Sequence, residues 1–82
     1  MTDTELLERI AIDSRVMVGK PVIRGTRLTV EFILGLLAHG AKTAEILGEY
    51  EGLTEADIHA CLLFAGKVLE DATFLPLTGK AS

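Results

Sequence analysis

A chain of 82 residues, 49% of them apolar, is long enough for one small domain and apolar enough to fill a core. Its formal net charge of −4 at pH 7 argues against a protein whose whole surface grips nucleic acid, and its single cysteine, Cys61, excludes an internal disulfide. The acidic start does not resemble a secretory signal and no apolar run could span a bilayer, so we expect a cytoplasmic protein without membrane contact.

The first third of the chain is expected to form a small β arm over residues 9–29, after a lead of residues 1–8. Polar and apolar residues alternate over 9–13 in the manner of a strand. Pro21 lacks a backbone N–H and should begin an edge strand. An arm of two or three short strands is marginal by itself, so it must lie on the helices or pair with a second copy.

Positive charge is concentrated in this arm. Residues 1–14 carry one arginine against four acids, and residues 31–82 carry three lysines against eight acids. Residues 15–30 carry four basic residues and no acid. A segregated patch of this kind can attract an anion even on an acidic protein.

Two arginines of the arm are predicted to face each other. Gly25 and Thr26 lie between two β-branched runs and would form a two-residue hairpin turn, with Arg24 and Arg27 opposite each other across it. Like charges placed this way destabilise a strand pair, so the pair favours an anion. The alternative is that the cations are solvated or paired with acids of their own chain. The predicted anion or nucleic-acid site comprises Lys20, Arg24 and Arg27.

Residues 30–70 are predicted to form a three-helix unit. Thr29 is a good N-cap for a first helix whose apolar residues recur every three or four positions, and Gly40 ends it. Thr43 is expected to cap a short second helix. The capping box of residues 54–57 opens a third helix that runs to about residue 70. We therefore expect a mainly α domain of tri-helical, helix-turn-helix layout.

The third helix carries few groups that read DNA. Its first turn holds Glu55 and Asp57, and the helix has no Arg, Asn or Gln that could contact bases or phosphates. Farther along it is apolar nearly all round, and a helix of that kind is buried on every side, which predicts a homodimer. The tail, residues 71–82, is either a loose terminus or an apolar hook for a partner. The predicted partner or dimer interface comprises Leu62, Leu63, Phe64, Phe74 and Leu75.

The chain lacks the residue patterns that carry catalysis. Gly19 and Lys20 do not belong to a phosphate loop, because Ser14 and Pro21 stand where that loop needs Gly and Ser or Thr. No Cys/His cluster has metal-ligand spacing and no nucleophile lies beside a base. We expect no catalytic residue, no metal, no cofactor and no enzymatic activity.

The stretch Gly19–Arg27, read as GKPVIRGTR, together with Leu53–Ile58 resembles a widespread small prokaryotic family similar to VapB-type antitoxins. The resemblance covers about residues 9–69. It implies a homeodomain-like helix-turn-helix fold, and it implies a gene neighbour encoding a PIN-like ribonuclease as the toxin. It carries over no catalytic residue.

The residues and the resemblance together predict an antitoxin-like protein. Such a protein would bind and inhibit a cognate PIN-like ribonuclease, with operator DNA as a second expected ligand. The alternative is a stand-alone DNA-binding regulator that uses the arm rather than the third helix, as β-ribbon proteins do.

Overall fold

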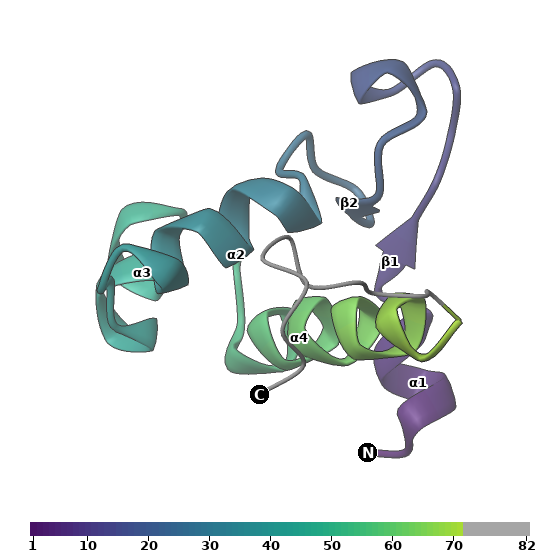
Figure 1. The fold of residues 1–82 in the computed structure, drawn as a ribbon. Coiled ribbons are helices and arrows are strands. Elements are labelled where there is room, and N and C mark those ends of the chain that lie inside the picture. Colours follow the sequence, from purple (N-terminus) through teal and green to yellow (C-terminus); the bar gives the residue numbers. More distant parts are fainter. Residues whose placement is uncertain (72–82) are drawn as a thin grey trace, which may run out of the picture.

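The structure is a computed structural model that describes residues 1–71. It is mainly helical, with four α-helices, one short 3-10 turn (η1) and a two-stranded antiparallel sheet (Figure 1). The elements are α1 (Asp3–Leu7), β1 (Ile10–Ala11), η1 (Met17–Gly19), β2 (Val22–Ile23), α2 (Val30–Ala38), α3 (Thr43–Glu49) and α4 (Glu55–Glu70). The predicted mainly α class with a small N-terminal β arm is confirmed at this level.

The three predicted helices are present within a few residues of their expected ends. The Thr29 hydroxyl accepts a hydrogen bond from the backbone N–H of Phe32 and caps α2, and Gly40 ends that helix at φ +95°. The cap of α3 differs from the prediction. Thr43 is the first residue of α3 and Lys42 precedes it as the N-cap, so Thr43 does not cap the helix.

A helix also occupies the predicted lead. Thr2 and Glu5 form a capping box in which each side chain accepts a hydrogen bond from the other residue's backbone N–H, at 3.2 and 2.9 Å. This reciprocal cap allows five residues to form α1, which packs against α4 (Figure 1). The N-terminal segment therefore contributes to the fold.

A single aliphatic core joins the arm to the helices. Every element except α1 and η1 contributes at least one buried side chain. Ile33 of α2, Ile46 of α3 and Ile58 of α4 are at most 2% exposed. The buried apolar residues are Ile10, Val22, Ile23, Val30, Ile33, Ile46, Leu53, Ile58, Ala60 and Cys61.

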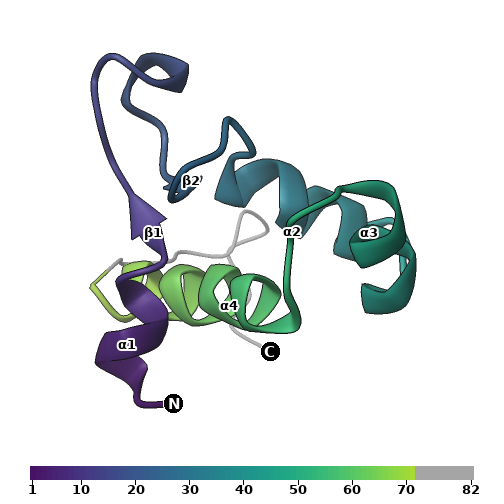
Figure 2. The ribbon, with the colours of Figure 1, turned by 180° about the vertical axis from the view of Figure 1, so that it is seen from behind.

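The arm is shorter and more irregular than predicted. Its sheet consists of two residue pairs, Ile10 with Ile23 and Ala11 with Val22. The segment between β1 and β2 extends away from α4, as Figures 1 and 2 show from opposite sides. The strand predicted over 9–13 therefore ends at Ala11, because beyond it the chain leaves the sheet.

The turn in the arm also differs from the predicted two-residue hairpin. The N–H of Thr26 donates to the carbonyl of Ile23 at 3.0 Å, and the N–H of Ile23 donates to the carbonyl of Leu28 at 2.9 Å. Four residues thus lie between the paired positions 23 and 28, and Gly25 takes the positive φ of +82° inside the turn. Arg24 lies within the turn, so Arg24 and Arg27 do not face each other as a strand pair.

The outer loop of the arm contains a strained backbone. Met17 and Val18 have φ of +48° and +57°, in the left-handed region that disfavours side chains branched at Cβ. Val18 is 93% exposed, so its side chain gains almost nothing from burial in this conformation.

Val18→Asn is expected to stabilise the protein by about 1 kcal/mol, because asparagine tolerates the left-handed conformation and no packing is lost. The free energy of unfolding in urea measures this change. A matched Val68→Asn substitution, at a half-exposed helical position without positive φ, should destabilise instead, because it relieves no strain and loses the buried half of the valine side chain.

Cys61 is buried in the core on α4. Desolvation, with a smaller contribution from the charge of Asp57, raises the pKa of its thiol to about 11. The folded protein should therefore react slowly with a disulfide reagent at pH 8 and rapidly in denaturant, because only the exposed thiolate attacks. Since the folded pKa is raised, the thiol's stabilising contribution is present below pH 9 and is lost as the pH rises toward 11. Equal reaction rates in the native and denatured protein would contradict this assignment.

Candidate functional site

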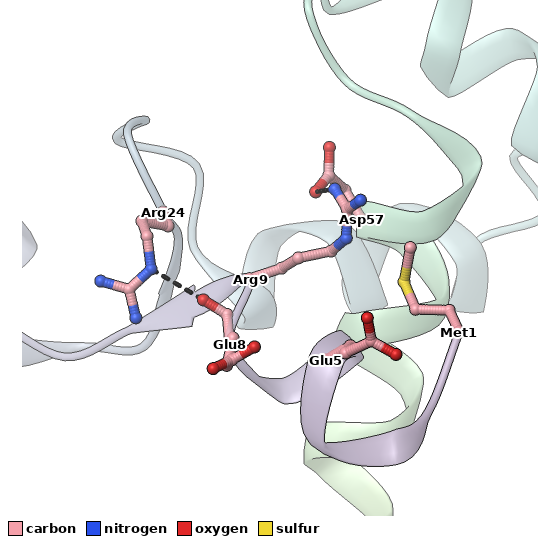
Figure 3. Close-up of a pocket in the computed structure, with 6 residues that line it drawn as sticks. All are labelled: Met1, Glu5, Glu8, Arg9, Arg24 and Asp57. Carbon is pink, nitrogen blue, oxygen red and sulfur yellow. Dashed lines mark hydrogen bonds and ion pairs between the residues drawn. The ribbon is translucent and has the colours of Figure 1, made fainter.

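Arg24, the first predicted anion ligand, is engaged with the backbone. Its Nε donates to the carbonyl of Glu8 at 2.7 Å (Figure 3). Its Nη2 donates to the carbonyl of Ile10 at 3.2 Å. The backbone N–H of Arg24 also donates to the carbonyl of Arg9, at 2.7 Å. Arg24 therefore fixes the turn of the arm to the junction between α1 and β1.

Two other cations of the arm are paired with exposed acids of their own chain. Lys20 Nζ lies 3.0 Å from a carboxylate oxygen of Glu31. Arg15 donates from both Nε and Nη2 to Asp13, and this pairing lowers the pKa of the Asp13 carboxyl. Exposed ion pairs contribute little free energy, so both cations can exchange these acids for another anion.

Arg27 differs from the other cations of the arm, because its side chain makes no hydrogen bond or ion pair among residues 1–71. Its side chain lies between two hollows of the surface. The first, of about 370 Å³, is lined mostly by arm residues, among them Ala11, Val16 and Gly25. The second, of about 270 Å³, is lined by Met17, Arg27, Leu28, Thr29, Phe32 and Tyr50.

An aromatic pair borders the second hollow. Phe32 of α2 and Tyr50 after α3 meet edge to face, with ring centroids 5.7 Å apart and planes at 89°. Phe32 remains 41% exposed. The sequence prediction missed this pair because the two residues lie on different helical segments, and only the fold brings them beside Arg27.

A third hollow, of about 410 Å³, lies between α1 and the start of α4 (Figure 3). Its charged centre is an ion pair in which Arg9 Nη1 donates to Asp57 Oδ1 at 3.0 Å. The other oxygen, Oδ2, accepts from the N–H and the hydroxyl of Thr54. Asp57, which the sequence suggested as an obstacle to DNA binding, is buried and fully hydrogen-bonded. Asp57 therefore stabilises the fold.

The predicted interface residues on α4 divide between core and surface. Phe64 packs against the core, Leu63 is partly buried and Leu62 is 50% exposed. Leu69, seven residues after Leu62, is 68% exposed on the same side of the helix. The outer side of α4 is therefore exposed in the single chain, and its predicted burial against a second copy stays a prediction. The remaining predicted interface residues, Phe74 and Leu75, lie outside the described residues.

Within residues 1–71, no group of three or more His, Cys, Asp or Glu side chains is placed to hold a metal ion. The same part of the chain contains no helix with the length and apolar character needed to cross a membrane.

Residues 1–71 thus form a small, mainly helical domain with a two-stranded β arm. The chain belongs to the family described as "Protein of unknown function (DUF433)", which matches residues 10–65. Its fold is similar to the crystal structure of a DUF433 member protein from Anabaena variabilis, with a TM-score of 0.73 and 31% sequence identity over 82% of this chain. The chain spans 66% of the length of that protein.

A shorter relative is an uncharacterized protein of Archaeoglobus fulgidus. It is 64% identical to this chain over 25 residues, which are 30% of this chain and 69% of that relative. Neither relative's description assigns a ligand or an activity.

Proposed function

We propose that this protein is an antitoxin-like inhibitor that acts in the cytoplasm and binds a cognate PIN-like ribonuclease. The observation that carries the proposal is Arg27, an exposed arginine without an internal partner among residues 1–71, placed beside exposed apolar and aromatic side chains. Arginine and aromatic residues are enriched where proteins bind each other. The resemblance of the GKPVIRGTR stretch to VapB-type antitoxins supports the same class of partner.

The proposed mechanism of inhibition is electrostatic. PIN-type nucleases hold metal ions in a cluster of acids, and a guanidinium can pair with a carboxylate through two parallel hydrogen bonds. Lys20 and Arg15 can add to the attraction, because their present partners are exposed acids that they can release. No catalytic residue of this chain takes part.

The proposed fold is homeodomain-like, with α2, α3 and α4 as its three helices. In that arrangement α3 and α4 form a helix-turn-helix, and the surface that reads DNA would be acidic. Glu45 and Glu49 lie exposed on α3 and Glu55 lies exposed at the start of α4. DNA binding as the main role is therefore the second candidate, and it would depend on the cations of the arm.

Co-expression with the neighbouring reading frame tests the first proposal. We expect a PIN-like ribonuclease to co-purify with the tagged protein and to lose RNA cleavage in its presence. If the nuclease neither co-purifies nor loses activity, the antitoxin proposal is wrong.

A salt titration tests the DNA-binding alternative. Affinity for operator DNA should then fall steeply with salt, and Arg27→Ala should make this dependence shallower, because one phosphate contact is lost. A slope and affinity unchanged by the substitution would remove this arginine from any DNA site.

We also propose a homodimer formed through the outer side of α4. Leu62 and Leu69, seven residues apart on that side, are each at least half exposed. Two exposed apolar residues are few for a permanent interface, so we expect association in the micromolar range.

A further inference from the structure

We propose that the Arg27 patch, made of the hollow-lining residues Met17, Arg27, Phe32 and Tyr50 and the adjoining exposed Val18, docks a protein segment that carries a carboxylate next to an apolar side chain. The inference rests on the proposed function, since the segment belongs to the proposed ribonuclease partner. It adds which surface of this chain binds and which chemistry the surface recognises.

The patch offers both parts of such a contact. The hollow of about 270 Å³ beside Arg27 is walled by Met17, Leu28 and the Phe32–Tyr50 pair, and it can take an apolar side chain. Arg27 stands at its edge and makes no ion pair within residues 1–71, so a carboxylate bound there displaces no acid of this part of the chain. An apolar anchor with a charge at its rim is the usual composition of a small binding hot spot.

The strained loop beside the hollow supports a binding role. Met17 and Val18 are held at positive φ, and Val18 exposes 93% of its surface next to Met17. An exposed valine in a backbone conformation that disfavours β-branched side chains destabilises the free protein. Strain of this kind persists where it presents side chains to a partner.

The charges favour a protein over a nucleic acid as the occupant. Aromatic rings and an arginine can also bind a single strand through stacking and phosphate contacts. Strand binding needs several cations along a groove, whereas Arg27 is the one cation among the described residues that line this hollow, and the chain carries a net charge of −4. One uncommitted guanidinium beside an apolar hollow matches one carboxylate beside an apolar side chain.

Affinity measurements with the purified ribonuclease from the neighbouring reading frame, kept inactive by omitting divalent metal ions so that its acids stay intact, test the inference. Arg27→Ala should weaken binding at least about tenfold. Val18→Asn should also weaken binding while raising the thermal unfolding midpoint of the free protein. These opposite signs separate loss of a contact from loss of the fold.

Two exposed positions outside the patch and outside the proposed dimer surface provide the controls, Lys67→Ala for the charge and Ile12→Gln for the apolar surface. Both should leave the affinity for the ribonuclease within about twofold. Wild-type protein that binds the ribonuclease, with both patch variants binding as tightly, would overturn this inference and leave the proposed function standing. Wild-type protein that does not bind it would overturn both. A labelled single-stranded RNA bound by the wild type and lost by Arg27→Ala would show a nucleic-acid occupant instead.

Discussion

Replacing Asp57 with alanine is expected to destabilise the domain by about 2–4 kcal/mol. Its carboxylate is buried and receives three hydrogen bonds, one from Arg9 and two from Thr54. The substitution removes the N3 half of the capping box of α4, while Thr54 still caps the helix, and it leaves Arg9 without its counter-ion. One side chain therefore connects the start of α4 to the beginning of β1.

Two further variants divide this effect into its parts. Asp57→Asn keeps an acceptor for Thr54 but removes the charge, so it should cost less than alanine. Arg9→Ala removes the ion pair alone, and the remaining carboxylate keeps its hydrogen bonds to Thr54. Urea unfolding of the three variants measures the differences. If Asp57→Ala changes the free energy of unfolding by less than about 0.5 kcal/mol, the buried ion pair does not stabilise the fold.

Leu62→Glu is expected to abolish the proposed homodimer while leaving the folded monomer intact. Leu62 is 50% exposed, so a glutamate there can reach water in the monomer and costs little. In a dimer the same carboxylate would be buried between two apolar helices without a partner.

Sedimentation of the wild type and the variant over a range of concentrations provides the measurement, with helical circular dichroism as the test of folding. The exposed Glu70, changed to Gln, is the control and should not alter association. Wild-type protein that sediments as a monomer at all micromolar concentrations would contradict the homodimer.

The helices could be predicted from the sequence because their signals are local. Thr29, Gly40 and the box of residues 54–57 act on backbone groups within four positions of themselves, and each takes its predicted role in the structure. The sequence did not show which apolar residues of α4 face the core of the chain itself. An apolar residue in a helix can face the core or the solvent, and only the packing of α1 and α2 on α4 decides which.

The candidate site could be predicted only in part. The concentration of cations in the arm is visible in the sequence. It still makes Arg27 a candidate, although Arg27 does not face Arg24. The roles of the other cations depend on contacts between distant positions, such as Arg24 with the carbonyls of residues 8 and 10. The Phe32–Tyr50 pair likewise arises from tertiary packing. The spacing of polar and apolar residues along the sequence does not reveal contacts between distant positions.

The attachment of Arg24 to the backbone of residues 8–10 has a consequence for recognition. A turn held at three points is already ordered before a partner arrives, so presenting Arg27 three residues later costs little additional conformational entropy. The arm is thus preorganised, and the conformational entropy lost when a partner binds is that of the Arg27 side chain alone. Replacing Arg24 with lysine keeps the charge but removes the forked geometry of the guanidinium. The substitution should therefore make the arm less ordered and slow the formation of a complex, without changing a residue of the interface.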